Sequence, residues 1–494
     1  MSSNQPLVLI ATRDLETLAL EEWSSRCAQD LNAGARLLTL FGRAGAGDTV
    51  LTTALLQGQD GVLRVLRGQG HRQQSFPSLT LLHPAAQMFE RELWEQTGVT
   101  PAGHPWLKPV RYQGLRQQCM HEHLFFKVRG QEVHEVGVGP IHASVIEPGH
   151  FRFMCHGEKV HHLELQLGYQ HRGVEALLLR RPALALAPLV ESIVGDSSVA
   201  YAWGYCAAVE ALTGSPLSEG TNLLRGVALE LERIAMHLAS LNGLATDIAF
   251  LQGGASYGRL RTAIINASMR ACGSRFGRGW LRPGGVRFAI NDALQQDLLA
   301  TLAAFSQDLA QVNTLMLQAR SVQSRFQGVG VVSQKVAQDI GLSGTVARAS
   351  AVALDTRVSL PGQPYTAHPV ALLTETSGDC WARMKQRMRE IDESLRWLNA
   401  ALQTPQRQCA SASPVALTGA LAAEHLCISV IEGFRGPVIQ ALETDAHGKL
   451  VHYKVQDPSL QNWFGLALAV RNNEISDFPI CNKSFDLSYC GNDL

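Results

Sequence analysis

Residues 223–241 read LLRGVALELERIAMHLASL, and this stretch decides the fold. Its apolar residues recur at steps of three and four: Leu224, Val227, Leu231, Ile234, Leu238 and Leu241. This spacing places them along one face of an α-helix, and a narrow apolar face is typical of a helix packed in a bundle. Glu230, Arg233 and His237 border that face, so we expect them mainly to form ion pairs with a neighbouring helix.

The same spacing recurs at 298–316 and at 381–402, and from about 176 to 402 the pattern is strongly helical. Residues 1–112 instead mix short strand-like runs (36–41, 50–56, 61–66 and 79–83) with helical stretches at 14–27 and 84–96. Apolar and polar residues alternate at 150–154 and 161–167, which predicts a β-hairpin. The chain returns to strands at 428–443 and 449–455 and ends with a helix-like run at 460–471.

The predicted fold class is therefore α+β. A small N-terminal α+β domain (1–112) precedes a linker (113–130). A large domain (131–494) follows, with a helical bundle at its centre and β-hairpins at its periphery. The C-terminal stretch 477–494 is apolar for a tail, and we expect it to be docked.

Charge excludes one class of function. The 494 residues hold 43 Lys and Arg against 43 Asp and Glu, and only 17% of the chain is charged. A nucleic-acid binder normally carries a basic excess, so we expect no nucleic-acid partner. A neutral, charge-poor chain of this size favours extensive contact with protein partners.

No stretch reaches the roughly 18 uncharged apolar residues of a membrane-spanning helix. The N-terminus lacks the basic and long apolar regions of a secretory signal. We therefore expect a cytoplasmic chain, soluble or peripheral to the membrane. Ten cysteines occur without a single CxxC pair, and no zinc or cluster spacing is visible.

Two short strings gather residues suited to proton transfer. GPIHASVIEPGHFRF (139–153) contains His142, Glu147 and His150, and the alternative is a hairpin whose histidines bond only to backbone. GYQHRGVE (168–175) contains Arg172 and Glu175 at i,i+3, for which a plain ion pair on one helical face is the alternative.

Several strings together resemble one family. They are GPIH with EPGHF, HRGVE, LELERIAMHL, RPGGV (282–286), VARASAVALDTR (346–357) and IEGFRGPV (431–438). They resemble the large subunit shared by respiratory complex I, where it is the 49 kDa-type subunit, and membrane-bound nickel–iron hydrogenases. FPSLTLLHPAAQMFERELWEQTGV (76–99) resembles the complex I 30 kDa-type subunit. The chain thus looks like a fusion of the two, as in formate hydrogenlyase-type complexes.

The resemblance implies that the metal ligands are lost. Hydrogenases of this family hold nickel and iron with two CxxC pairs, because a soft centre needs thiolates. Val194 and Ser197 stand at the first pair, with Tyr201 in place of a nearby histidine, and Ser488 and Gly491 stand at the second. The resemblance therefore implies that this chain binds no metal.

The resemblance also points to residues near a quinone. The family's quinone-site tyrosine corresponds to Gly195, so Tyr201 is a candidate substitute, and His150 corresponds to the quinone-site histidine. Asp355 and Arg357 match the family's DxR…PY element. We assign Glu147, His150, Arg172, Glu175 and Tyr201 to catalysis and proton coupling, and His142, Asp355 and Arg357 to cofactor contact.

The expected function follows from the resemblance. The chain would be the large subunit of a complex-I-like membrane oxidoreductase on the cytoplasmic face of the cell membrane. The complex would couple electron transfer to ion translocation, and a quinone is one candidate for the electron acceptor. An iron–sulfur small subunit would cover the cavity formed by 140–150, 191–201 and 484–491, integral membrane subunits would lie below, and any NADH would bind elsewhere in the complex. One alternative is a redox-silent coupling subunit of an antiporter-like complex. The other is an active nickel–iron hydrogenase, which predicts stoichiometric nickel.

Overall fold

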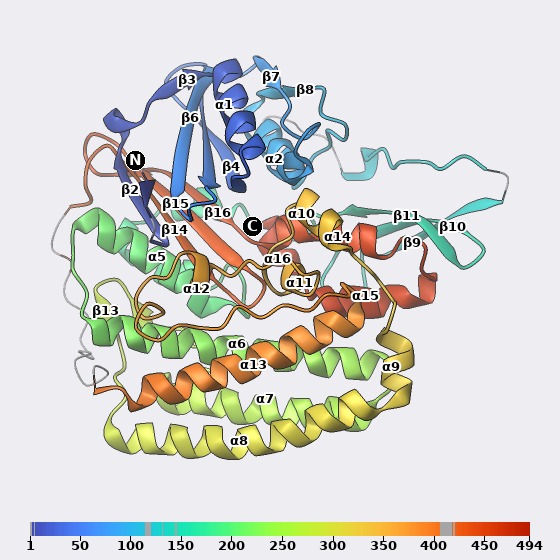
Figure 1. The fold of residues 1–494 in the computed structure, drawn as a ribbon. Helices are drawn as coiled ribbons and strands as arrows, with labels where there is room; N and C mark the ends of the chain where they lie inside the picture. Colours follow the sequence, from blue (N-terminus) through green and yellow to red (C-terminus); the bar gives the residue numbers. More distant parts are fainter. Residues whose placement is uncertain are drawn as a thin grey trace.

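The computed structural model describes residues 2–3, 5–113, 120–130, 132–143, 146–405, 417 and 420–494. Part of the predicted linker (114–119, with Cys119) and Cys409 lie outside the described residues. Figure 1 shows three levels: the N-terminal sheet with its helices, a C-terminal sheet in the middle, and long helices on the far side. No helix in the described ranges is long and apolar enough to cross a bilayer.

Four long helices form the predicted bundle: α6 (Glu219–Asp247), α7 (Leu251–Cys272), α8 (Asp292–Gln318) and α13 (Cys380–Gln403). Helices α6 and α8 each pack against both α7 and α13. The buried residues of α8 are its predicted apolar face, Leu298, Leu302, Phe305, Leu309, Val312 and Met316, together with Asn313. The periodicity therefore identified the packed face of this outer helix correctly.

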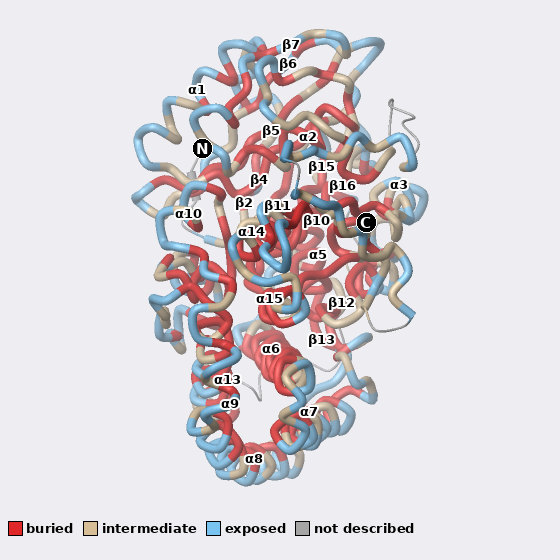
Figure 2. The backbone as a smooth tube through the Cα atoms, turned by 90° about the vertical axis from the view of Figure 1, so that its right-hand side faces the viewer, coloured by how far each residue is buried: buried red, intermediate tan, exposed pale blue. Residues whose placement is uncertain are grey.

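We expected helix α6 to bury one narrow apolar face, but it is buried almost all round. It contacts α5 (Ser198–Thr213) and α15 (Phe478–Phe485) as well as its bundle neighbours. Figure 2 shows this helix as an almost unbroken buried segment. Consequently Glu230, Arg233 and His237 are 0% exposed and lie inside the protein rather than at the edge of its packing.

The N-terminal sheet is built from three antiparallel strands, β4 (Arg36–Ala44), β5 (Thr49–Gln57) and β6 (Leu63–His71). The short strands β1 (Ser2–Ser3) and β3 (Thr17–Ala19) both pair with β6. Helices α1 (Leu20–Asn32) and α2 (Gln87–Thr97) pack against this sheet. The predicted strands at 36–41, 50–56 and 61–66 are confirmed.

Two local predictions in this region are wrong. The helix expected over 14–27 begins only at Leu20, because residues 17–19 pair with β6. The strand expected over 79–83 is a pair of turns. The buried carboxylate of Glu90 accepts hydrogen bonds from the Leu79 amide and the Thr80 hydroxyl, at 2.7 and 2.6 Å, so this segment folds around α2 rather than joining a ladder.

The middle sheet has the order β16 (Leu450–Gln456), β15 (Pro437–Thr444), β14 (His425–Glu432) and β2 (Leu7–Ala11). All three pairings are antiparallel, with Leu9 opposite Cys427 in the β2–β14 pair. Helix α5 packs on β14 and β15. Residues of the N-terminal sheet, among them Leu38 and Phe41, share a core with Ile428 and Ile439.

A third sheet of β9 (Val133–Val138), β10 (His150–His156) and β11 (Lys159–Gln166) confirms the predicted hairpin and projects from the body in Figure 1. The chain ends in α14 (Ser459–Ala469), α15 and α16 (Tyr489–Asp493). The tail is docked, since Asp493 accepts from the Gly168 and Gln170 amides at 2.8 Å.

The remaining described strands are β7 (Ser75–Pro77), β8 (Thr100–Ala102), β12 (Leu281–Arg282) and β13 (Gly285–Val286). The remaining described helices are α3 (Val174–Leu178), α4 (Ala187–Val190), α9 (Arg320–Phe326), α10 (Gln334–Asp339), α11 (Gly344–Arg348) and α12 (Thr356–Ser359). Single-turn 3₁₀ helices lie at Thr12–Asp14, Pro84–Ala86, Met120–Glu122, Ala183–Ala185 and Ile475–Asp477.

Candidate functional site

Arg172 connects two of the three loops that the sequence places around a site. Its guanidinium donates to the carbonyls of Ser192 and Ile193 at 3.2 and 2.9 Å, and to that of Cys490 at 2.9 Å. The third loop is close by, because Gly149 packs against the ring of Tyr489. The structure thus brings together segments 139–150, 191–197 and 486–491.

A second connection between these segments is ionic. The Arg435 guanidinium donates to both carboxylate oxygens of Asp196, at 2.8 and 2.9 Å, and lies 3.8 Å from the Asp486 carboxylate. Burial by itself would raise the pKa of Asp196, but the Arg435 charge lowers it. Arg435, in the turn between β14 and β15, therefore binds the loop before α5 through a bidentate pair and lies beside the residue that follows α15.

Tyr201 lies on the first turn of α5 and is 0% exposed. Its hydroxyl donates to Asp457 Oδ2 at 2.6 Å, and Asp457 Oδ1 accepts from the Ser459 amide at 2.7 Å. Burial, reinforced by the Asp457 charge, raises the pKa of Tyr201 well above its usual range. The phenol is therefore a neutral donor held inside the protein.

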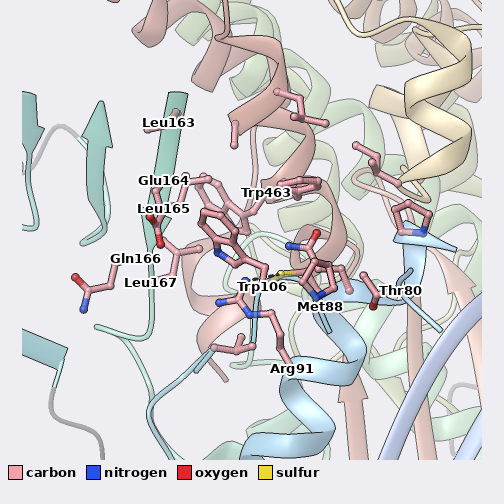
Figure 3. Close-up of a pocket in the computed structure, with 18 of the residues that line it drawn as sticks. Thr80, Met88, Arg91, Trp106, Leu163, Glu164, Leu165, Gln166, Leu167 and Trp463 are labelled. Atoms are coloured by element: carbon pink, nitrogen blue, oxygen red, sulfur yellow. Dashed lines mark hydrogen bonds between the residues drawn. The ribbon is translucent and has the colours of Figure 1, made fainter. Parts of the chain in front are cut away.

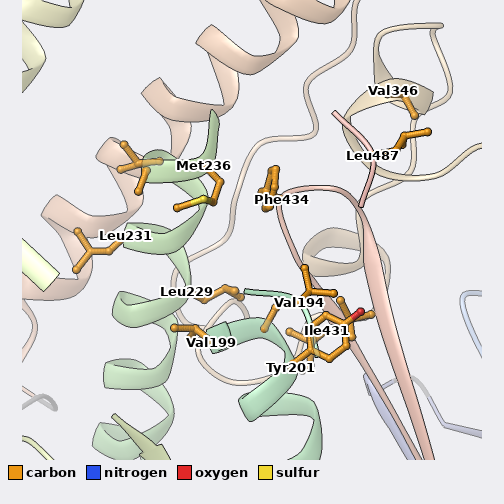
Figure 4. Packing of buried hydrophobic residues seen from close by; sticks show 14 of the residues in the cluster. Val194, Val199, Tyr201, Leu229, Leu231, Met236, Val346, Ile431, Phe434 and Leu487 are labelled. Carbon is orange, nitrogen blue, oxygen red and sulfur yellow. The ribbon is translucent and has the colours of Figure 1, made fainter. Parts of the chain in front are cut away.

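The positions that the resemblance aligns with metal ligands lie around this pair. Val194 is buried in the same apolar cluster as Phe434 and Leu487, and Figure 4 shows Val194 beside Tyr201 and Ile431. At Gly491 an added Cβ would lie 2.5 Å from Asp457 Oδ2. The space is thus filled by apolar side chains and by the Tyr201–Asp457 hydrogen bond.

The loop 139–150 holds its two histidines by backbone carbonyls. His142 Nε2 lies 2.7 Å from the Gly149 oxygen, and His150 Nδ1 lies 3.1 Å from the Gly139 oxygen. Burial lowers the pKa of His150, so its imidazole is mainly neutral at neutral pH. Both histidines therefore form hydrogen bonds with backbone carbonyls, as in the alternative of a hairpin whose histidines bond to backbone. The carboxylate of Glu147 lies on the same loop at the surface.

Arg172 and Glu175 do not form the ion pair that their i,i+3 spacing indicated. Helix α3 begins after Gly173, whose positive φ of 65° turns the chain, so Arg172 lies outside the helix. Glu175 instead pairs with Lys454 at 2.9 Å and accepts from Gln96 at 3.1 Å. Burial would raise the pKa of Glu175, but the Lys454 and Arg111 charges lower it.

The Glu175 contact belongs to a junction between the N-terminal region and β16. Lys454 also binds Glu92 of α2 at 2.5 Å, and Arg111 binds the same Glu92 carboxylate. The buried carboxylate of Glu92 and the half-buried carboxylate of Glu175 thus share one ammonium group, which ties α2, α3 and β16 together.

Asp355 and Arg357 lie in a buried ionic cluster between α12 and α6. Arg357 Nη2 donates to Asp355 at 2.7 Å, while its Nη1 lies 3.0 Å from Glu230 Oε1. The Tyr365 hydroxyl donates to Glu230 at 2.6 Å. Burial would raise the pKa of Glu230, but Arg357 and Arg233 lower it. Arg357 and Tyr365 also line a cavity of about 470 Å³ beside Trp203.

Sequence reasoning missed the centre of this cluster. Glu390 on α13 accepts from Arg233 at 2.7 Å and from Arg348 at 2.9 Å, and its carboxylate lies 3.2 Å from His237. Arg348 also pairs with Glu432 at 2.8 Å. Arg348 and Glu432 lie within strings that carried the resemblance, which was the available signal. Nothing in the local sequence distinguishes Glu390 from Asp392, the exposed acid of α13.

Glu232 is a second group that sequence reasoning missed. It reaches from α6 to the start of α5 and accepts from the amides of Val199 and Ala200, at 2.6 and 3.1 Å. Although these bonds favour the carboxylate, burial raises the pKa of Glu232 to about 8. A buried carboxyl group with a raised pKa therefore contacts the backbone directly before Tyr201.

Metal-ligand groupings were sought across the described ranges. No three His, Cys, Asp or Glu side chains among them gather in an arrangement that would hold a metal ion. Seven of the eight described cysteines are buried, and Cys490 is half-buried.

Comparison with known families supports the resemblance. Residues 255–418 match the family described as respiratory-chain NADH dehydrogenase, 49 kDa subunit. Residues 36–114 match the family described as the 30 kDa subunit of the same enzyme. The 30 kDa match precedes the 49 kDa match along the chain, in the same order as the sequence stretches that resemble these two subunits.

Curated relatives span most of the chain. Formate hydrogenlyase subunit 5 of Escherichia coli is 27% identical over 440 residues, covering 84% of this chain and 76% of that protein. The membrane-bound hydrogenase subunit alpha of Pyrococcus furiosus is 27% identical over 365 residues, covering 71% and 85%. An NADH-quinone oxidoreductase subunit from Desulforamulus reducens is 28% identical over 355 residues, covering 71% and 96%.

The fold also has a counterpart among solved structures. A chain of the membrane-bound sulfane sulfur reductase, an archaeal respiratory membrane complex, superposes with a TM-score of 0.68 at 22% identity. The match covers 74% of this chain and 99% of that chain. The chain therefore matches the complex I 30 kDa and 49 kDa subunit families over two separate regions and is similar over most of its length to formate hydrogenlyase subunit 5 and to the membrane-bound hydrogenase subunit alpha.

Proposed function

We propose that this chain is the large subunit of a complex-I-like membrane complex that couples electron transfer to ion translocation without a nickel–iron centre. The observation that carries the proposal is the meeting of segments 139–150, 191–197 and 486–491 through Arg172 and Arg435. Glu147 and His150 belong to the first of these segments and Tyr201 follows the second, in a chain similar to hydrogenase and NADH-quinone oxidoreductase subunits.

The residues at the aligned ligand positions do not fit a nickel–iron centre. Valine, serine and glycine supply no thiolate, and a soft centre needs several thiolates. A cysteine at position 491 would collide with Asp457, since even its Cβ would lie at 2.5 Å. Restoring thiolates would therefore require Tyr201 and Asp457 to move apart.

We assign the proton chemistry to groups of this chain. We assign the half-buried His150 and the exposed Glu147 as the proton carriers of this loop. Because the Tyr201 hydroxyl is fully buried, Tyr201 acts by positioning Asp457. Arg172 is a positioning residue for both loops that it holds.

The remaining assigned residues lie deeper. Glu175 links the site to the N-terminal region through Lys454. Asp355 and Arg357, which belong to the ionic cluster around Glu230 and Glu390, would transmit a charge change across α6. His142 closes the 139–150 loop by its hydrogen bond to Gly149, and we assign it to contact with the acceptor. A quinone is the acceptor that the NADH-quinone oxidoreductase relatives favour.

The partners follow from the same reasoning. An iron–sulfur small subunit covers the meeting point of the three segments and delivers electrons, and integral membrane subunits lie below it. Ile141, which is 88% exposed on the 139–150 loop, is a natural contact for such a partner. The chain would then lie on the cytoplasmic face of the membrane. We propose that residues 1–112 and 131–494 form its two domains.

Metal and cofactor analysis of the intact purified complex tests the proposal. We expect iron and acid-labile sulfide from the partner, no nickel at stoichiometric level, and a reduced cluster signal in electron paramagnetic resonance that disappears when a quinone is added. Stoichiometric nickel would contradict the proposal and identify an active hydrogenase.

A redox-silent coupling subunit is the second candidate. It is favoured by the closed packing around Tyr201, where Asp457 and apolar side chains fill the centre. This candidate predicts ion transport by a complex in which no cluster signal changes with NADH or quinone. A cluster that a quinone reoxidises excludes it.

A further inference from the structure

A cavity of about 510 Å³ lies where the N-terminal region meets the C-terminal helices. Its walls come from α2, the segment 105–112, β11, α10 and α14, as Figure 3 shows. None of the eight residues assigned to the candidate site lines this cavity. Its volume falls in the range of sites that enclose a small organic molecule.

Aromatic rings form much of the cavity wall. Trp106 and Tyr112 contribute from the N-terminal side, and Trp463 and Phe464 contribute from α14. The Trp106 ring also lies 5.8 Å from the imidazole of His162 on β11. Flat faces of this kind favour a planar, apolar ligand body.

One cation on the wall has no counter-charge. Arg471 follows α14 and is half-buried, and no carboxylate among the described residues lies within salt-bridge distance of it. Burial therefore lowers the pKa of Arg471. The nearby Glu164 does not serve it, because Lys108 and His123 bind that carboxylate at 2.6 and 2.9 Å.

The same wall carries an excess of hydrogen-bond donors. Arg471 Nη2 donates to His162 Nδ1 at 3.3 Å, which places the imidazole proton on Nε2. This His162 N–H, the Arg471 Nε–H and the Trp463 indole N–H have no acceptor in the described part of the chain. Among the buried side-chain atoms of the described residues on this wall, Asn492 Oδ1 is the one acceptor without a partner. The carboxylate of Asp339, which is exposed and also lines the cavity, pairs with Lys335 at 2.7 Å. Buried donors without partners are costly, so the wall is suited to an anion.

We propose that this cavity binds an aromatic carboxylate. The planar ring lies against Trp106 and Trp463, and the carboxylate accepts from the guanidinium of Arg471. The inference does not depend on the proposed electron-transfer function, because neither the ligand nor the cavity residues take part in it.

Isothermal titration calorimetry of 2-naphthoate into the purified intact complex tests this site. We expect saturable binding with one site per chain. We expect Arg471→Gln to weaken it at least about tenfold, because a charge-assisted pair is lost. The matched control Arg320→Gln removes an exposed arginine of α9 and should leave the affinity unchanged.

Two further measurements separate the ring from the charge. Trp106→Ala keeps Arg471 and should weaken the binding of 2-naphthoate severalfold, because one aromatic wall is lost. The uncharged analogue 2-naphthalenemethanol should bind the wild-type complex and the Arg471→Gln variant with equal affinity. The absence of binding to the wild type would overturn the inference, and so would equal affinity in Arg471→Gln and Arg320→Gln. Thermal unfolding of each variant verifies that it is folded.

Discussion

The hydroxyl of Tyr201 donates a 2.6 Å hydrogen bond to Oδ2 of Asp457, and the two side chains are 0% and 3% exposed. Asp457 Oδ1 accepts from the amide of Ser459 at the start of α14. Gly491 of the C-terminal segment packs against the same carboxylate. One aspartate therefore joins α5, α14 and α16.

Tyr201→Phe is predicted to destabilise the protein by about 1–3 kcal/mol, because it leaves one oxygen of a buried carboxylate without its donor. Thermal unfolding of the purified complex measures the effect. Tyr169→Phe is the matched control, since the Tyr169 hydroxyl donates a longer bond of 3.2 Å from a half-buried position. Equal melting temperatures for the two variants would contradict the importance of the Asp457 bond.

Arg357→Met is predicted to cost about 3–5 kcal/mol, because it leaves two buried carboxylates without their shared cation. These are Asp355 and Glu230, both at most 4% exposed. Arg320→Met, which changes an exposed arginine, should leave stability nearly unchanged. Soluble yield and thermal unfolding of the two variants give the comparison. A variant at 357 as stable as the one at 320 would show that the ionic cluster contributes little.

Periodicity predicted the elements well where one face is buried and the other exposed. The outer helix α8 satisfies that condition, and its buried residues are those predicted, with Asn313 added. Helix α6 does not, because α5 and α15 cover the faces that the bundle leaves open. Its charged residues therefore resemble surface residues in sequence while lying in the core.

Long-range pairing was beyond the reach of local patterns. Nothing in the stretch 7–11 indicates that it pairs with β14 from the other end of the chain. Similarly, the i,i+3 spacing of Arg172 and Glu175 assumed one continuous helix, which Gly173 interrupts. The resemblance located the segments that meet at the site, but it did not reveal Glu232 or Glu390, whose roles depend on tertiary contacts.

Glu232 predicts a pH dependence of stability. Its pKa is raised from 4.5 to about 8 by burial, so between these two values the folded protein holds a proton that the unfolded chain releases. The free energy of unfolding therefore falls as the pH rises through this window, by up to about 1.4 kcal/mol per pH unit, and stops falling once the folded carboxyl has ionised.

Glu232→Gln removes this titration. The difference in unfolding free energy between wild type and variant should therefore change steeply from about pH 5 to about pH 7.5 and level off above about pH 8. Chemical unfolding at several pH values measures it, and Glu16→Gln, at an exposed acid, should follow the wild type throughout. Parallel curves for wild type and Glu232→Gln would show that the carboxyl is ionised in the folded protein across this range.

Glu147→Gln is predicted to lower proton transport by the assembled complex by about tenfold or more while leaving its assembly intact. The carboxylate is exposed on the loop that carries His142 and His150, so its loss removes a proton carrier without leaving a buried partner unpaired. Proton uptake in vesicles that contain the purified complex gives the rate. Glu158→Gln changes an exposed acid next to β11 and should transport at the wild-type rate. Unchanged transport in the Glu147 variant would remove this residue from the proton path, because no other carboxylate lies on the described part of that loop.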